Sequence, residues 1–373
     1  MDFSLSEDNL MLRQSARTFL DKEISLAKVQ VPGATVADAG YEANWSKIAA
    51  MGWPGLVIDE AWGGLGLSCI DLAMILGEMG RSLAPSPLLG TLFGTWALQK
   101  GGSQSQKRTI LPGVAAGTTK LALAIAESSG AVDGPCREAR AVRHGAGYRL
   151  TGVKSFAIDA ASADWLVVAA QDEASGRRAF YLVDARQDGV QADPLDWRDV
   201  TREVCDVRLK DAEGEKLEAD DAALWPWLRD RVLLALAVES AGVLQKVLET
   251  TTEYAKERVA FGKAIGGYQS IKHSLAEMLG KSECSNTAVL YAAWALSGEH
   301  ERASLAAAMA KAFAGEAAVA AAHRSIQIFG AIGFTWEMPN HLYYKRARAN
   351  AELFGSPRSQ RARVIGMVEK KAA

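Results

Sequence analysis

The sequence predicts an α+β protein with several domains, in which helices come first, a small β domain follows and a helical bundle ends the chain. The length of 373 residues exceeds what one hydrophobic core usually holds, because domains of roughly 100 to 200 residues are typical. Apolar residues change from helical spacing to short runs near Thr119 and return to helical spacing after Leu224. We therefore expect an N-terminal helical domain over residues 1–118, a middle β-barrel or β-sandwich domain over residues 119–222 and a C-terminal four-helix bundle over residues 223–373.

The N-terminal domain shows helical spacing from its start. Apolar residues recur at the intervals of a helix between Ser6 and Leu20. Ser6 is a suitable N-cap, since its hydroxyl can accept a hydrogen bond from a free backbone amide of the first turn. The same spacing predicts further helices over residues 44–51, 70–80 and 88–100.

The middle domain consists of short apolar runs bounded by Gly, Asp and Ser, which is the pattern of strands. Gly145 and Gly147 stand just before one of these runs and predict a hairpin turn, because glycine adopts the positive φ values that such turns need. The β region extends to about Asp211. The predicted strands lie within residues 120–126, 148–151, 155–158, 165–170 and 179–183.

Long helices return in the C-terminal part. Residues 228–258 contain no proline and predict a helix of about thirty residues, which would be roughly 45 Å long. Two more helices are expected over residues 269–296 and 301–329. The last is rich in alanine, so that backbones can approach closely at its interfaces.

Composition argues against several classes of function. A net charge of -2 gives no broad positive field, so we expect no nucleic-acid partner. The four cysteines lie too far apart for a zinc knuckle, a CxxC pair or a disulfide framework, which fits a reducing, cytoplasmic setting. The acidic N-terminus and the absence of about 18 uninterrupted apolar residues predict neither a signal peptide nor a membrane span. The five histidines show no metal-binding spacing, so no metal site is expected.

Two motifs at the ends of long helices could contact a ligand. In the segment 254–263, Arg258 is able to hold a phosphate group and Phe261 to stack on a planar ring. Further along, Gln327 places a side-chain amide near Gly330, where a ligand or another backbone can approach. The first motif alone is also compatible with a charged helix end followed by a turn.

Together the two motifs resemble those of the acyl-CoA dehydrogenase family, and the resemblance covers essentially the whole chain, including the helical, β, helical order. It implies α,β-dehydrogenation of an acyl-CoA thioester, FAD as cofactor, an electron-transfer flavoprotein as acceptor and a homo- or heterotetramer with a homologous subunit. It also implies that the FAD pyrophosphate and adenine are held by residues of neighbouring subunits, namely Arg258, Phe261 and Gln269 together with Gln327 and Gly330.

The segment 333–344 is similar to the subset of this family that acts on bulky acyl-CoA substrates, including steroid side chains, often as assemblies of unlike subunits. Trp336 within it is equally compatible with ordinary packing at a subunit interface.

The chain departs from the family at the catalytic base. Phe354 stands where many relatives have a glutamate before a glycine, and Val232 stands at the alternative position on the long helix. Neither side chain can take a proton. Glu239 lies seven residues past Val232, which is two helical turns and nearly the same face, in apolar surroundings that would raise a carboxyl pKa. We expect Glu239 to be the base; a helix-interior glutamate bonded to a neighbouring arginine is the alternative.

The β domain departs from the family as well. Ala126 lacks the hydroxyl that relatives place against the flavin, while Glu127 is retained. On a further flavin-contacting strand Phe156 can still pack on a ring, whereas Ile158 cannot donate a hydrogen bond. We expect Glu127 and Phe156 to contact the cofactor.

These departures leave two explanations open: a divergent enzyme with its own flavin contacts, or a non-catalytic partner subunit that completes the FAD site of a catalytic homologue. A third option is a flavin enzyme of the same fold that follows a nitroalkane or acyl-CoA oxidase route.

Overall fold

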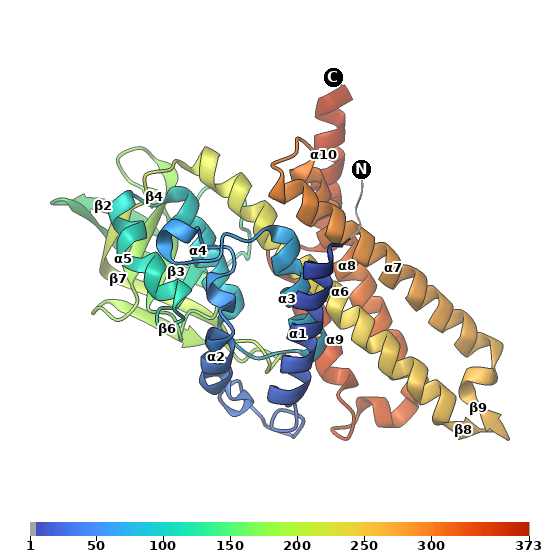
Figure 1. Ribbon diagram of the computed structural model, residues 1–373. Helices are drawn as coiled ribbons and strands as arrows, with labels where there is room; N and C mark the ends of the chain where they lie inside the picture. Colours follow the sequence, from blue (N-terminus) through green and yellow to red (C-terminus); the bar gives the residue numbers. More distant parts are fainter. Residues whose placement is uncertain (1–4, 373) are drawn as a thin grey trace.

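The computed structural model describes residues 5–372, so that residues 1–4 of the expected N-terminal domain and residue 373 lie outside it. Figure 1 shows the strands of the middle domain gathered at one side of the molecule, α1 and α3 near the middle and the long C-terminal helices at the other side.

The first helix, α1 (Glu7–Glu23), begins where the sequence predicts. The Ser6 hydroxyl accepts from the Asn9 amide at 3.1 Å, and the Asn9 side-chain oxygen accepts from the Ser6 amide at 3.2 Å. Ser6 is therefore confirmed as the N-cap. The three other predicted helices are present as α2 (Tyr41–Ala50), α3 (Cys69–Ser82) and α4 (Leu88–Gly101), with short 3-10 helices η1 (Ala37–Ala39), η2 (Trp53–Gly55) and η3 (Glu60–Trp62) between them.

A further helix, α5 (Gln104–Ala115), was not predicted. It contains Pro112 and Gly113, which read as helix breakers in a sequence. Ser103 begins it with a capping box, because its hydroxyl accepts from the Gln106 amide and the Gln106 side chain accepts from the Ser103 amide.

The middle of the chain forms a mixed sheet. Its strands follow the order β1-β4-β2-β3-β7-β5, β6 pairs with β7, and β5 also pairs with β4, which closes the sheet into a barrel. This confirms the predicted β domain. The strands are β1 (Leu121–Ala124), β2 (Arg140–His144), β3 (Gly147–Ile158), β4 (Trp165–Asp172), β5 (Arg177–Asp184), β6 (Val190–Pro194) and β7 (Val204–Lys216).

The predicted hairpin joins β2 and β3: His144 pairs with Gly147, and Gly145 has a φ of 60°. Two predicted runs, 148–151 and 155–158, belong to the single strand β3, whose pairing with β7 is interrupted by irregularities. The strands β6 and β7 were missed, because exposed charged residues break up their apolar pattern.

The C-terminal helices are α6 (Asp221–Glu257), α7 (Gln269–Ser297), α8 (Ala303–Phe329), α9 (Asn340–Glu352) and α10 (Pro357–Ala372), with the short strands β8 (Val259–Ala260) and β9 (Lys263–Ala264), and the 3-10 helices η4 (Ile265–Gly267) and η5 (Gly330–Phe334). The predicted long helix starts earlier than expected. Asp220 caps it, since its carboxylate accepts from the Ala223 amide at 2.8 Å, and the helix continues through Pro226.

The helix α8 lies at the centre of the bundle, where it packs against α6, α7, α9 and α10. By length and composition the segment Ala303–Phe334 could cross a membrane, but 67% of its most apolar window is buried inside the fold. That burial is typical of the core helix of a bundle.

The helices α3 and α6 cross in direct backbone contact. A Cβ atom added at Gly242 would lie 1.9 Å from the carbonyl oxygen of Gly77, and one added at Gly80 would lie 2.2 Å from the carbonyl oxygen of Glu239. Only residues without side chains allow this approach, which attaches the N-terminal helices to the bundle.

One of the two predicted domain boundaries falls between secondary-structure elements, and the other falls inside a helix. The boundary at 118/119 lies between the end of α5 and the start of β1, whereas the boundary at 222/223 lies inside the first turn of α6. The division at these residues stays a prediction.

Candidate functional site

A cleft with a volume of about 460 Å³ lies between the β barrel and the C-terminal helices. We call it the flavin cleft, after the cofactor that the family resemblance implies. The barrel contributes the end of β1, the loop after it and Phe156 of β3; the helices contribute the turn between α9 and α10. The lining residues are Leu123, Ile125, Ala126, Ser128, Ser129, Gly130, Ala131, Val132, Phe156, Trp197, Glu352, Leu353, Phe354, Gly355, Ser356 and Ser359.

Two aromatic side chains form one side of this cleft. Phe156 has a φ of 58°, and its ring centroid lies 6.4 Å from that of Trp197, which belongs to the loop between β6 and β7. A positive φ is uncommon for a phenylalanine and is kept only where the surroundings hold it. The predicted contact residue Phe156 thus presents a flat apolar face to the cleft.

Glu127 does not line the cleft. Its carboxylate is turned into the barrel, where it accepts from the amides of Arg137 and Ala139 and from Lys154 Nζ at 2.9 Å. Burial acts to raise the pKa of Glu127, but the hydrogen bond from the Arg137 amide and the contact with Lys154 outweigh it and lower the pKa to about 2. A flavin contact by its side chain stays a prediction; the observed bonds join the segment just before β2 to Lys154 of β3.

Phe354 does line the cleft, and it is almost buried. It has a φ of 57° and packs edge-on against Phe93 of α4 with ring centroids 5.6 Å apart. Its carbonyl accepts from Gln360 Nε2 at 3.1 Å. The position at which relatives carry a base is therefore filled by an apolar ring, as the sequence indicates.

The turn that carries Phe354 is held from inside the bundle by Lys311 of α8. The side chain is 0% exposed, and Nζ donates to the carbonyls of Ala351 at 2.9 Å and Gly355 at 3.2 Å. Burial lowers the pKa of Lys311 to about 7, against the attraction of Glu352. No local pattern in the alanine-rich helix distinguishes this lysine, so its role cannot be predicted from the sequence.

Glu239, the predicted base, is 2% exposed and lies outside the flavin cleft. Arg202 Nη2 donates to both of its carboxylate oxygens, at 2.7 and 2.6 Å, and Asn350 Nδ2 donates to one of them at 3.3 Å. Arg346, which pairs with Asp199, lies 3.6 Å away. These are the contacts of the alternative that the sequence left open, a helix glutamate bonded to an arginine. Catalysis by Glu239 stays a prediction.

The two adenine-side motifs lie at the end of the bundle remote from the flavin cleft. Arg258 is the C-cap of α6, and β8 and β9 form a small hairpin whose turn carries Phe261, 97% exposed. Figure 1 shows this hairpin projecting from the far end of the long helices, on the side opposite the barrel.

The second motif lies at the same end. Tyr254 of α6 stacks on Phe329, the last residue of α8, with ring centroids 3.9 Å apart. Gly330 follows directly with a φ of 70°. The side chains expected to hold FAD from this end are all exposed: Arg258, Phe261, Gln269 and Gln327. The structure thus brings the two motifs together and separates both from the cleft of their own chain.

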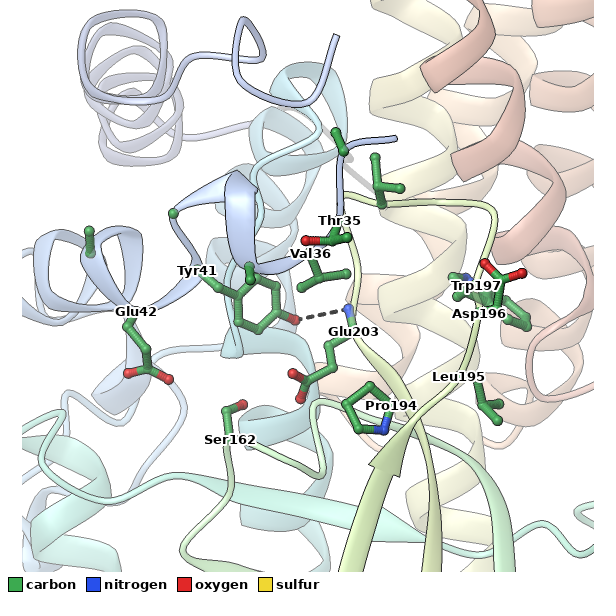
Figure 2. Close-up of a pocket in the computed structure, with 15 residues that line it drawn as sticks. Thr35, Val36, Tyr41, Glu42, Ser162, Pro194, Leu195, Asp196, Trp197 and Glu203 are labelled. Atoms are coloured by element: carbon green, nitrogen blue, oxygen red, sulfur yellow. Dashed lines mark hydrogen bonds between the residues drawn. The ribbon is translucent and has the colours of Figure 1, made fainter. Parts of the chain in front are cut away.

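A second cavity of about 710 Å³ lies between the segment 34–43 and the loop 194–203, and Trp197 lines both cavities. Figure 2 shows Tyr41 pointing toward the start of β7, where the Glu203 amide donates to its phenol oxygen at 3.4 Å. The Tyr41 hydroxyl donates to Asp159, whose pKa is raised by burial to about 7. Within residues 5–372, no three His, Cys, Asp or Glu side chains are placed to hold a metal ion.

The flavin cleft suits the planar ring system of FAD. Phe156 and Trp197 offer aromatic surface, the end of β1 offers apolar surface, and Ser356 and Ser359 offer hydroxyl groups to the polar edge of such a ring. The hydroxyl missing at Ala126 leaves fewer donors on the barrel side.

Comparison with known proteins agrees with this arrangement. The N-terminal domain model of acyl-CoA dehydrogenase matches residues 6–118, and the C-terminal domain model matches residues 230–367. The acyl-CoA dehydrogenase IpdE2 of Mycobacterium tuberculosis is 31% identical over 354 residues, which cover 94% of this chain and 94% of that protein.

Solved structures show the same likeness. A variant of the steroid ACAD Tcur3481-Tcur3483 is 28% identical, with a TM-score of 0.87 and coverage of 99% of both chains. A chain of the ChsE4-ChsE5 complex from Mycobacterium tuberculosis is 25% identical, with a TM-score of 0.87 and the same coverage. The likeness to the steroid-type, heteromeric subset is thereby confirmed. On these grounds the chain belongs to the acyl-CoA dehydrogenase family of FAD-dependent oxidoreductases, which act on acyl-CoA.

Proposed function

We propose that this chain is a subunit of a tetrameric acyl-CoA dehydrogenase that introduces a double bond between the α and β carbons of a bulky acyl group. The observation that carries the proposal is the distance between the two halves of its FAD site. Phe156 and Phe354 line a cleft beside the barrel, whereas Arg258 and Phe261 project from the opposite end of the bundle. Each cleft is completed only when a neighbouring subunit supplies the second half.

The residues of the chain divide into two sets of tasks. Phe156 packs on the flavin ring and Ser356 offers it a hydroxyl, while Arg258 and Gln327 of a neighbour hold the pyrophosphate and adenine. When bound, FAD accepts the hydride that leaves the β carbon of the substrate. The almost buried Phe354 and the apolar end of β1 keep water from the reacting carbons.

The proposed substrate and partners are supported by the likeness to known proteins. A steroid side chain is supported by the likeness to a structure described as a steroid ACAD, and unlike subunits by the likeness to the ChsE4-ChsE5 complex. An electron-transfer flavoprotein is the proposed electron acceptor, since a relative from Acetobacterium woodii is named as a subunit of a caffeyl-CoA reductase-Etf complex. The free cysteines Cys69, Cys136, Cys205 and Cys284 suit a cytoplasmic location.

A second candidate function is favoured by two side chains of the cleft. The side chain of Phe354 cannot accept a proton and that of Ala126 cannot donate a hydrogen bond, so the chain could serve as a non-catalytic subunit that completes the FAD site of a catalytic homologue. Its hairpin would then act on the homologue's flavin, and its own cleft would stay idle.

The visible spectrum separates the two. The chain is purified alone and after co-expression with a homologous subunit, and flavin is measured per chain before dehydrogenation is assayed with a steroid-side-chain CoA thioester and a straight-chain one. Co-expression is expected to give the yellow, active form. Stoichiometric FAD on the chain alone would argue against a heteromer, and flavin in one cleft of every two would favour the non-catalytic role. Lack of dehydrogenation with either thioester in both preparations would refute the proposed function.

A further inference from the structure

The residues that line the flavin cleft are almost all apolar or hydroxyl-bearing. Among those that the structure describes, Glu352 alone has a titratable side chain. It is the last residue of α9 and lies two residues before Phe354. The apolar ring at Phe354 thus removes the family's usual carboxylate from the cleft, but a carboxylate remains on the same turn.

The carboxylate of Glu352 is not bound tightly elsewhere. Its nearest ionic partner is Arg348, one helical turn earlier, with 3.8 Å between Oε1 and Nη2 and both side chains 53% exposed. Exposed ion pairs of this kind contribute little to the stability of a protein and are easily broken. Glu239, by contrast, accepts two short hydrogen bonds from Arg202 and is 2% exposed. A proton acceptor needs a free oxygen near the substrate, and of the two residues only Glu352 has one.

The backbone around Glu352 is fixed at both ends. Lys311 Nζ binds the carbonyl of Ala351, just before Glu352, and the carbonyl of Gly355, just after Phe354. The three residues between them, 352–354, are those that the turn presents to the cleft. A catalytic group has to be held in place by atoms that do not themselves react, and the buried ammonium of Lys311 meets that condition.

We propose that Glu352 is the proton-accepting group of this cleft and that Lys311 is its positioning residue. The inference rests on the proposed dehydrogenation. A carboxylate oxygen of Glu352 takes the α-proton, so that an O–H bond forms as the α C–H bond breaks. The electron pair of that bond becomes the second bond between the α and β carbons as the β hydrogen leaves with its own pair as hydride. The thioester is oxidised and FAD, which takes the hydride, is reduced.

A 3-alkynoyl-CoA thioester tests the assignment without relying on turnover. Removal of its α-proton and return of a proton to the γ carbon produce an electrophilic allene, and the carboxylate beside it adds to the β carbon to form an ester. The FAD-loaded protein, alone or with its homologous subunit, is treated with this probe, digested and analysed by mass spectrometry. We expect the adduct on Glu352. An adduct on Glu239 or on a residue of the homologous subunit, or no adduct at all, would overturn the assignment.

Three variants sharpen the result. Glu352→Gln is expected to remove the adduct and to slow dehydrogenation by about a hundredfold or more, in the range of general-base catalysis. Glu316→Gln is the matched control, because this glutamate of α8 is 61% exposed, pairs with Arg361, and neither residue lines the cleft. Glu239→Gln addresses the rival carboxylate: a loss of the adduct in a folded, flavin-bound Glu239→Gln protein, with the adduct kept in Glu352→Gln, would assign the base to Glu239 instead.

Lys311 is tested by the rate of adduct formation. Lys311→Met is expected to form the adduct about tenfold more slowly while keeping its flavin, and Lys311→Arg to recover part of the rate, because arginine can still donate to both carbonyls. An unchanged rate in Lys311→Met would overturn the positioning role. An adduct on Glu352 in a protein that never dehydrogenates would refute the proposed function and leave this inference standing, whereas dehydrogenation without that adduct would do the reverse.

Discussion

Replacing Lys311 with methionine should change how the stability of the protein depends on pH. In the native chain the ammonium group is fully buried, and burial lowers its pKa from the ordinary value of 10.5 to about 7. In the unfolded chain the pKa returns to the ordinary value. Below pH 7 both states carry the proton; between pH 7 and about 10.5 the unfolded state keeps a proton that the native state has lost. The free energy of unfolding therefore rises with pH across this window.

The magnitude follows from the size of the shift. One proton bound in the unfolded state and absent from the native state adds roughly 1.4 kcal/mol per pH unit. From pH 7 to pH 9 the native chain should thus gain about 2–3 kcal/mol relative to Lys311→Met, which has no group to titrate there. At pH 7 itself the two effects of the substitution oppose each other, because methionine removes a costly buried charge but leaves the carbonyls of Ala351 and Gly355 without their donor.

Urea unfolding at pH 7, 8 and 9, followed by the fluorescence of the ten tryptophans, measures this difference. Lys272→Met is the control, because Lys272 is exposed on α7 and its replacement should shift the free energy of unfolding equally at the three pH values. Other titrating groups are common to all the proteins and cancel in the comparison. Parallel pH dependence of the native chain and Lys311→Met, within about 0.5 kcal/mol, would refute the argument that burial depresses this pKa.

Three further outcomes are expected. Arg202→Met should lower the free energy of unfolding by about 3–5 kcal/mol, measured by urea titration, since it leaves the buried carboxylate of Glu239 without the arginine that binds both its oxygens. A loss below about 1 kcal/mol would contradict this. Gly242→Ala should lower the free energy of unfolding by more than about 3 kcal/mol, because its methyl group would overlap a backbone oxygen. The control Gly280→Ala, whose methyl group would meet nothing within 4 Å, should leave the free energy of unfolding unchanged or raise it by up to about 1 kcal/mol. Equal melting temperatures of the two variants would contradict the close crossing of α3 and α6. Phe261→Ala should release FAD from the assembled enzyme without changing the free energy of unfolding of the chain. Val259→Ala, at a neighbouring exposed residue, should retain the flavin. Equal flavin content in the two variants would show that Phe261 does not belong to the FAD site.

Local signals explain the parts of the fold that could be predicted. Ser6 and its partner Asn9 lie within one helical turn, so residues close together in the sequence determine where α1 starts. The start of α6 was missed because Pro226 reads as a helix breaker, although the cap at Asp220 lies before it. The strand β7 is absent from the predicted strands, since one of its faces is exposed and its charged residues interrupt the apolar pattern.

The site could be predicted where it depends on residue type and not where it depends on contacts between distant segments. Phe156 and Phe354 were singled out by position, and both line the cleft. The assignment of Glu239 rests on helical periodicity and on its apolar neighbours in the sequence, which say nothing of Arg202, thirty-seven residues away on another segment. Glu352 could not be predicted, because a charged residue at the end of a helix is usually exposed to solvent. Only the folded structure shows that the turn after it lines a cleft beside the barrel.

The composition of α8 bears on how the bundle settles into one arrangement. Its buried surface consists mostly of alanine methyl groups, which are nearly alike in size and shape, so rotating or sliding the helix by a residue would exchange one methyl for another at small cost. Lys311 breaks that degeneracy. Its amino group reaches two particular carbonyl oxygens at a single rotation and height of the helix, and any other setting would leave that polar group buried without partners. The same side chain that holds the turn of the cleft therefore fixes the alignment of the helix around which the bundle is built.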